Sequence, residues 1–385
     1  MEIRFDRIAR LQANMRASGL VAIVVLNHDD FRYLFGHDRT QPRAIVPFEG
    51  PPEIIVFTGE EPDLTASLGA AGQDGRVRVF KSVGGQINDV VGRIRQLALD
   101  GPAAGLPLGD SGRPKVGLQM WFHTPAFLVD LFRQVNPEVE VVSSDPVMDP
   151  LRSVKDEGEI ARLAEAQRVA GIGMDRAREL LRPGVTAQEV ATEVLYAMMR
   201  AGAEGTSTPI YVNFGSDTCM LHGLLSGRPL ERGQLAIVDL TPQVEGYCAN
   251  LARTFVAGEP NALQSNLIDS YREVVEAVRP AMVPGATVAK LDEVAKAVLG
   301  RRGLAEYQVF GIGHGIGLRF EEAPASTIIP PHRNLPLREG MAMTIGHTVL
   351  AVPGVGGARF EDVYLVTPAG ARILSEQPVE PVLTV

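Results

Sequence analysis

The chain has 385 residues, enough for two domains, and its hydrophobic fraction of 45% suffices for two buried cores. The formal net charge is −9 and nothing in the sequence resembles a basic stripe, so binding to nucleic acid or to an anionic membrane is not expected. The opening segment MEIRFDRIARLQANM places charges where a signal peptide needs an apolar run, and no apolar stretch reaches the roughly 18 residues of a membrane span. We therefore expect a cytoplasmic protein, with Cys219 and Cys248 as reduced thiols.

The first part of the chain alternates predicted helices and strands. An amphipathic helix is expected near residues 4–18, with further helices near 87–99 and 124–135. The strands are predicted from the apolar runs VAIVVL (21–26), RAIVPF (43–48), PEIIVF (52–57), RVRVF (76–80), KVGLQ (115–119) and VEVVSS (139–144). The segment DDFRYLFGHDR, which ends at Arg39, is expected to be a loop. This order predicts an α/β domain with a mixed sheet.

A domain boundary is predicted near residue 150. The segment SSDPVMDPLRSVKDEGEI contains two Asp-Pro steps, which favour extended or turn conformations, before a charged helix begins. We therefore assign residues 1–150 to the first domain and residues 151–385 to the second.

The second domain contains a helix, Pro-Gly turn, helix pattern twice. Its copies align on Pro183-Gly184 and Pro284-Gly285, which lie 101 residues apart. In the first copy Thr186 and Glu189 predict a capping box at the start of the second helix. Strands are predicted at 209–214 and within 235–257 for the first copy, and at 341–351 and 358–367 for the second. The repeat predicts two related α+β halves around a central cleft.

Acidic and histidine side chains are expected to meet in this cleft. In LAIVDLTPQVEGYCANLARTF two strand-like runs meet at a Glu245-Gly246 turn, so Asp239 and Asn250 can face each other across a hairpin. The glycine-rich stretch GIGHGIGLRFEEAP carries His314, and the strand GARFEDVYLV carries Glu361.

The order of these motifs resembles the creatinase/prolidase/methionine aminopeptidase superfamily, the Xaa-Pro dipeptidase-like peptidases of family M24. The resemblance covers essentially the whole chain, from RSVKDEGEIARLAEA through CMLHG, VDLTPQVEGYCANLARTF, GIGHGIGL and GMAMTIGHTV to GARFEDVYLVTPAG. It implies a creatinase-like N-terminal α/β domain followed by a pita-bread catalytic domain made of two α+β halves. It also implies a homodimer that acts on a small molecule, in which the N-terminal domain reaches over the partner's active site. Arg39 could then contact a substrate carboxylate, whereas charged residues of this segment are more often solvated surface residues.

The resemblance implies five metal ligands, namely Asp, Asp, His, Glu and Glu, which bind two divalent ions. Three of them match Asp239, His314 and Glu361, whereas the second Asp falls on Asn250 and the first Glu falls on Gly346. Because an amide is neutral and glycine has no side chain, we expect this degenerate site to bind no paired metal ions.

The alternative is one divalent ion (Mn, Co or Zn) on Asp239, His314 and Glu361, with help from His347 or Glu321. His347 follows Gly346 in a predicted strand, so its side chain is expected to point to the opposite face.

Without metal, the resemblance points to creatinase, a hydrolase of a carbon–nitrogen bond. His222 in MLHGLL matches the histidine that the family places beside the substrate, and its near-neutral pKa suits a general acid/base. Creatinase activity itself is not expected, because two glutamates of creatinase correspond to Ala252 and Gly346 in this sequence. The residues predicted to act in catalysis are His222, His314, Glu321 and Glu361, and those predicted to contact substrate are Asp239, Asn250, His347, Arg359 and Arg39.

Three hypotheses follow. The preferred one is metal-independent hydrolysis of a carbon–nitrogen bond in a small polar nitrogen compound. The second is a divalent-metal-dependent Xaa-Pro dipeptidase or aminopeptidase with a degenerate site, and the third is a non-catalytic binding module.

Overall fold

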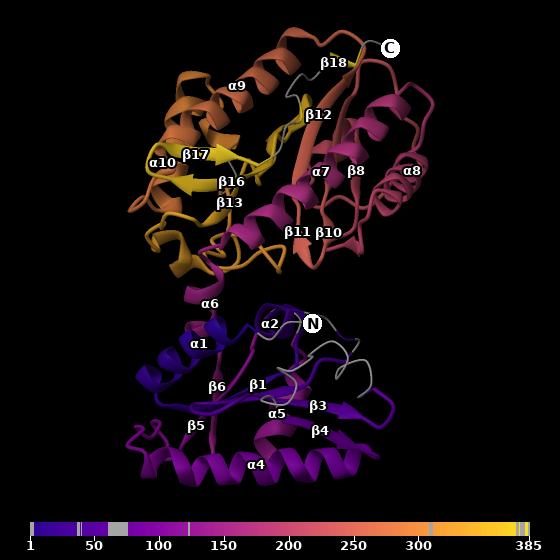
Figure 1. Ribbon diagram of the computed structural model, residues 1–385. Coiled ribbons are helices and arrows are strands. Elements are labelled where there is room, and N and C mark those ends of the chain that lie inside the picture. The colour runs from indigo at the N-terminus through magenta and orange to yellow at the C-terminus, as the bar shows by residue number, and fades with distance from the viewer. Residues whose placement is uncertain are drawn as a thin grey trace. The chain divides into compact units, whose positions relative to one another are not determined.

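The computed structural model describes residues 4–36, 39, 41–60, 76–121, 124–307, 311–374, 377 and 382–383. The chain divides into two compact units, Met1–Arg152 and Ser153–Val385 (Figure 1). Each unit contains its own sheets and helices, with one sheet in the first unit and several smaller sheets in the second.

The first unit is built on one six-stranded mixed sheet in the order β4-β3-β2-β1-β5-β6 (Figure 1). Its strands are β1 (Leu20–Val25), β2 (Ala44–Pro47), β3 (Glu53–Phe57), β4 (Arg76–Phe80), β5 (Lys115–Leu118) and β6 (Glu140–Ser143). β1 is antiparallel to β2 and parallel to β5, and β3 and β6 are parallel to β4 and β5, respectively. All six residues of the central β1 are buried, as its uninterrupted apolar sequence predicts.

The helices of this unit include two that the sequence analysis did not predict. The described helices of the first unit are α1 (Phe5–Ser18), α2 (His28–Phe35), α4 (Val83–Ala103), α5 (Ala126–Val135) and α6 (Asp145–Arg152). The two that were not predicted are α2 and α6. The prediction of a loop after β1 was wrong, because residues 28–35 form the short helix α2, in which Phe31, Leu34 and Phe35 are buried. Gly36 ends this helix in the left-handed conformation, with a φ of 65°.

The turn predicted from the two Asp-Pro steps was also wrong, since these residues form α6. Pro146 lies in the first helical turn, where its missing amide hydrogen is not needed. Val147, Met148 and Leu151 are buried on the face that α6 turns inward.

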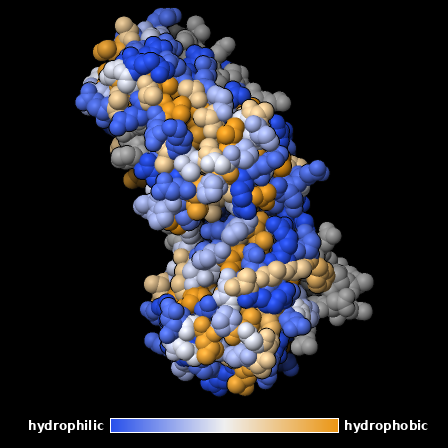
Figure 2. Space-filling view, turned by 90° about the vertical axis from the view of Figure 1, so that its left-hand side faces the viewer, coloured by the Kyte–Doolittle hydropathy of each residue, from blue (hydrophilic) through white to orange (hydrophobic). Residues whose placement is uncertain are grey.

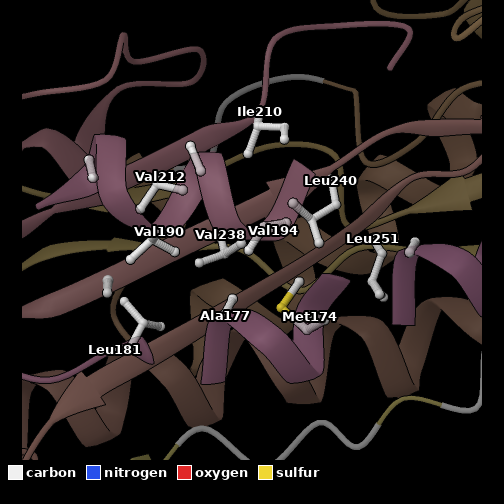
Figure 3. Packing of buried hydrophobic residues seen from close by; sticks show 14 of the residues in the cluster. Met174, Ala177, Leu181, Val190, Val194, Ile210, Val212, Val238, Leu240 and Leu251 are labelled. Carbon is white, nitrogen blue, oxygen red and sulfur yellow. The ribbon is translucent and has the colours of Figure 1, made fainter. Parts of the chain in front are cut away.

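The first half of the second unit packs two long helices on a sheet. The helices are α7 (Glu157–Leu180) and α8 (Ala187–Arg200), with the short 3-10 helix η2 (Gly215–Cys219). Its strands are β7 (Gly205–Thr206), β8 (Tyr211–Phe214), β9 (Leu235–Leu240), β10 (Pro242–Val244), β11 (Tyr247–Cys248), β12 (Leu251–Ala257) and β18 (Val382–Leu383), and the main sheet has the order β18-β12-β9-β8. Figure 3 shows Met174 and Val194 of the two helices packed toward Val238 and Leu240 of β9.

The second half repeats this plan with α9 (Ala262–Val278) and α10 (Val288–Arg301). Its strands are β13 (Ala342–Ile345), β14 (Leu350–Val352), β15 (Gly356–Ala358), β16 (Asp362–Thr367) and β17 (Gly370–Ile373), and its 3-10 helices are η3 (Arg279–Ala281), η4 (Ala305–Tyr307) and η5 (Pro330–Asn334). A second hydrophobic core lies between α9, α10 and these strands.

The internal repeat has a counterpart in the backbone. Gly184 and Gly285 both have positive φ, 97° and 88°, and each donates its amide to a leucine carbonyl, Leu230 or Leu337, at 2.8 Å. Each Pro-Gly turn leads to a helix that a threonine caps. The predicted capping box forms: Thr186 Oγ1 accepts from the Glu189 amide, and Glu189 Oε2 accepts from the Thr186 amide at 2.8 Å.

Hydrophilic side chains cover much of the molecular face in Figure 2, with hydrophobic residues scattered between them. This mixture is ordinary for a folded protein, which always leaves part of its apolar surface exposed. None of the helices in the described part of the chain is both long enough and apolar enough to cross a membrane.

The core between α7, α8 and β9 gives a direct test of the fold. Met174 is fully buried in it, whereas Met199 near the end of α8 is 46% exposed. Met174→Ala should lower the free energy of unfolding by about 2–5 kcal/mol because it leaves a cavity. Met199→Ala should change that free energy by no more than about 0.5 kcal/mol. Urea unfolding followed by circular dichroism measures both, and equal losses would contradict the packing.

Candidate functional site

One row of residues crosses the main sheet of the second unit and ends at Glu361. Tyr211 of β8 pairs with Asp239 of β9, and Asp239 pairs with Ala252 of β12. Ala252 in turn forms an isolated antiparallel bridge with Glu361, with backbone N–O distances of 3.0 and 3.1 Å. Because directly paired residues share one face of a sheet, Asp239 and Glu361 lie on the same face on either side of the small Ala252 side chain.

The predicted hairpin turn forms at Glu245 and Gly246, which both have positive φ, 46° and 76°. This turn type suits the twist of the two short strands β10 and β11 that flank it. Beyond it, the Asn250 amide Nδ2 donates to Asp239 Oδ1 at 3.1 Å. The prediction that positions 239 and 250 face each other is confirmed.

A buried arginine occupies the centre of the site. The Arg359 side chain is 1% exposed, and its Nη1 donates to Asp239 Oδ2. Its Nε and Nη2 both donate to the backbone carbonyl of His347, the former at 2.7 Å. The Thr254 hydroxyl accepts from the Arg359 amide at 2.7 Å and donates to the Arg359 carbonyl at 2.9 Å. The guanidinium therefore fixes both Asp239 and the backbone at His347.

His314 is held by the neighbouring strand β13. Its amide lies 3.2 Å from Thr344 Oγ1, and its carbonyl accepts from the Thr344 amide at 2.8 Å. Its imidazole Nδ1 lies 3.0 Å from the Gly315 carbonyl, and its Nε2 lies 3.9 Å from Glu361 Oε1. The ring is fully buried.

His347 also points into the site, so the prediction that it faces away was wrong. Strand β13 ends at Ile345, and Gly346 adopts a φ of 105°, so the two-residue alternation of a strand does not continue to His347. Its Nδ1 lies 3.3 Å from Glu361 Oε1, and its ring makes an edge contact with His314 at a centroid distance of 4.7 Å.

His222 lies at the exposed side of this cluster. Its ring centroid is 6.0 Å from that of buried His347 and 5.3 Å from that of half-buried Tyr211. Partial burial lowers the pKa of His222, and the positive charge of Arg359 lowers that pKa further. The side chain is therefore neutral near pH 7.

Glu321 is not one of the residues grouped with His314, His347 and Glu361, although its charge acts on His347. Glu321 Oε1 accepts hydrogen bonds from the amide and hydroxyl of Thr327, the amide at 3.2 Å. Arg39 belongs to the first unit, where its Nη2 lies 3.5 Å from Glu60 Oε1. Its predicted contact with substrate across a homodimer stays a prediction.

Burial dominates the electrostatics of the acidic side chains. It raises the pKa of Asp239 to about 6, against the opposing effect of the Arg359 charge. It also raises the pKa of Glu361, again opposed by Arg359. The pKa of His347 lies well below its usual value, first because of burial and then because His314 and Arg359 are close.

Sequence reasoning missed two tyrosines that shape the site. Tyr211 contacts His222, and its place opposite Asp239 follows from the β8–β9 register, which one sequence does not reveal. Tyr271 of α9 is buried, with its hydroxyl 2.5 Å from the Gly346 carbonyl and close to the Thr348 carbonyl. It therefore holds the backbone on both sides of His347.

Comparison with known proteins places this geometry in a family. The model of metallopeptidase family M24 matches residues 161–368, and that of the creatinase/prolidase N-terminal domain matches residues 7–154. The chain belongs to metallopeptidase family M24. The fold is accordingly the expected one, a creatinase-like domain followed along the chain by a pita-bread domain, and the protein is a hydrolase.

Individual relatives support the same assignment. The chain is 31% identical over 249 residues to an Xaa-Pro dipeptidase of Pyrococcus furiosus, covering 65% of this chain and 70% of that one. Its structure resembles that of an Xaa-Pro dipeptidase from Bacillus anthracis, with a TM-score of 0.84 and 23% identity over 98% of this chain and 99% of that one. A dipeptidase from Mycobacterium ulcerans gives a TM-score of 0.81 and 27% identity, over 99% of this chain and 98% of that one.

The residues of this M24 chain do not fit the pair of divalent ions that the family resemblance implies. At position 250 an amide donates to Asp239 where a second carboxylate is expected. At position 346 a Cβ would lie 1.8 Å from the Phe360 carbonyl oxygen, so the neighbouring backbone occupies the space that a glutamate needs. Two negative charges are therefore absent, and Arg359 already pairs with one of the acids that remain.

The close backbone approach at Gly346 is testable with a matched glycine. Gly354 also has a positive φ, 78°, but a Cβ there would meet nothing within 4 Å. Gly354→Ala should cost only about 1–2 kcal/mol of the free energy of unfolding, for the left-handed conformation. Gly346→Ala should cost more than about 4 kcal/mol, because the Phe360 backbone must also move. Thermal unfolding compares them, and equal melting temperatures would refute the contact.

Proposed function

We propose that this M24 chain hydrolyses a carbon–nitrogen bond in a small substrate of dipeptide size, with His222 as the group that moves the proton. The observation that carries the proposal is the position of His222, an exposed imidazole against a buried group of acids and imidazoles. A site of this kind gives a substrate one solvent-accessible proton carrier beside side chains that water does not reach.

The chemistry of His222 suits this task. Because its pKa is lowered, the neutral ring can accept a proton from an attacking water and return it to the leaving nitrogen. The contact with Tyr211 restricts where the ring lies. Tyr211 therefore acts as a positioning residue for His222.

We propose that Arg359 holds other residues of the site in place and does not contact the substrate. Its nitrogens donate to Asp239 and to the His347 carbonyl, and its side chain is almost completely buried. Asp239 is likewise occupied by Arg359 and Asn250. We therefore propose that Arg359, Asp239 and Asn250 hold the site together, in place of the contact with substrate that was expected for them.

The relatives favour a dipeptide over the guanidino or amide compounds that creatinase suggests. Proteins named Xaa-Pro dipeptidase or dipeptidase match the chain in both sequence and structure. Of the three hypotheses drawn from the sequence, the relatives support the second, a divalent-metal-dependent Xaa-Pro dipeptidase or aminopeptidase with a degenerate site, better than the preferred metal-independent one. The substrate class we propose is therefore an Xaa-Pro dipeptide.

His222→Ala tests the proton-transfer role. The rate of hydrolysis of Xaa-Pro dipeptides, measured as the release of free proline, should fall by roughly 10²–10⁴-fold, which is the usual contribution of a general acid/base. Leu224→Ala is the matched control, because Leu224 lies in the same segment and is 81% exposed. It should leave both turnover and the melting temperature unchanged.

The substrate panel should include Xaa-Ala dipeptides, small amides and guanidino compounds, each with and without added divalent ions. Cleavage of the amides or guanidino compounds alone would replace the dipeptide proposal with the creatinase-like one. Full activity of the His222→Ala variant would show that His222 does not transfer the proton. Folded protein that binds these compounds and cleaves none would make the chain a binding module.

A further inference from the structure

Three buried polar atoms of the site have no hydrogen-bond partner within the described part of the chain. They are Nε2 of His314, Oε2 of Glu361 and Oδ1 of Asn250, and all three side chains are fully buried. An unpaired buried polar atom costs roughly 1–3 kcal/mol. Nε2 of His314 faces the Glu361 carboxylate, 3.9 Å from Oε1, so one bound partner between these two side chains can satisfy both of them.

The tautomer of His314 follows from its contacts. Its Nδ1 lies 3.0 Å from the Gly315 carbonyl, which can only accept a hydrogen bond, so Nδ1 carries the proton. The lone pair of Nε2 is then free and lies on the side of Glu361. A histidine that donates one ring nitrogen to a carbonyl and offers the other is oriented as metal-binding histidines are.

His347 brings a second imidazole to the same carboxylate. One possible ligand atom each from His314, His347 and Glu361 lies within 4.8 Å of the other two. A tetrahedral ion with bonds near 2.1 Å separates its ligand atoms by roughly 3.4 Å. The distances from Glu361 Oε1 to His347 Nδ1 and His314 Nε2, 3.3 and 3.9 Å, are close to that value.

We infer that His314, His347 and Glu361 bind a single divalent transition-metal ion, with His347 supplying the ligand that glycine at position 346 cannot. Asp239 is not part of this set, because Arg359 and Asn250 already occupy its oxygens. Three protein ligands leave one position open, as in catalytic rather than structural zinc sites. The inference rests on the proposed hydrolysis for the use of the ion, but not for its binding.

The donor atoms also select the kind of ion. Two imidazole nitrogens and one carboxylate suit Zn²⁺ or Co²⁺, whereas Mn²⁺ and Mg²⁺ prefer sites made of oxygen. A carboxylate-rich pair site would show weaker discrimination between these ions. We therefore expect Zn²⁺ and Co²⁺ to bind more tightly than Mn²⁺.

The test is ion binding by the full-length protein after removal of metal with a chelator. Equilibrium dialysis against Zn²⁺ with elemental analysis should give one ion per chain, and Co²⁺ should produce the visible absorption bands of a tetrahedral site. His347→Ala should weaken Zn²⁺ binding beyond the roughly 10–100-fold typical of residues that only support a ligand. His347→Asn retains a hydrogen-bond donor toward Glu361 and should show the same loss.

Controls separate this inference from the proposed function. His222→Ala should bind one ion like the original chain, whatever happens to its turnover. Far-ultraviolet circular dichroism of the metal-free variants identifies any that fail to fold, and Glu361→Gln, which keeps the side-chain volume, provides a further variant lacking only the charge. Two ions per chain, no ion, or unchanged binding in folded His347→Asn would each overturn the inference.

Discussion

The buried ion pair between Arg359 and Asp239 is the interaction on which the site depends. The same guanidinium holds the carbonyl of His347, and the Arg359 backbone is fixed by Thr254 on β12, the strand next to the one that carries Asp239. Removing one partner of such a pair costs about 3–5 kcal/mol, because the other charge stays buried and unpaired. Glu361 follows Arg359 by two residues in the segment between β15 and β16, and its Oε2 lies 3.9 Å from Arg359 Nε.

Charge balance connects this ion pair to the altered ligand set. Asn250 and Gly346 each remove a negative charge from the positions where the family resemblance expects carboxylates, and together these equal the charge of one divalent ion. Arg359 pairs closely with Asp239, whereas its Nε lies 3.9 Å from Glu361 Oε2, so Glu361 is the more available of the two acids to a cation. A site with fewer acids and one additional imidazole from His347 is consistent with one ion in place of two.

Much of the fold was predictable from local patterns. The apolar runs predicted the strands of both units, the Glu245-Gly246 turn predicted the hairpin, and Thr186 with Glu189 predicted a capping box that forms. These features depend on neighbouring residues, which the sequence contains directly. Helix α2 was missed because only eight residues form it and its stability comes from burial against the rest of the first unit.

The site was less predictable because it depends on contacts between distant segments. The membership of Asp239, His314 and Glu361 followed from the family resemblance, but the orientation of His347 depends on the φ of Gly346, which a strand pattern does not reveal. Arg359 donates to Asp239, which lies 120 residues earlier in the sequence, and local patterns do not reveal a contact over that separation.

We infer that one ion binds between His314, His347 and Glu361, and that no pair of ions binds beside Asp239. Crystals of the full-length chain grown with Co²⁺ can be measured by anomalous diffraction at the cobalt absorption edge. We predict one anomalous peak per chain, between His314, His347 and Glu361. A pair of peaks beside Asp239 and Asn250, or no peak at a saturating concentration of cobalt, would contradict the account.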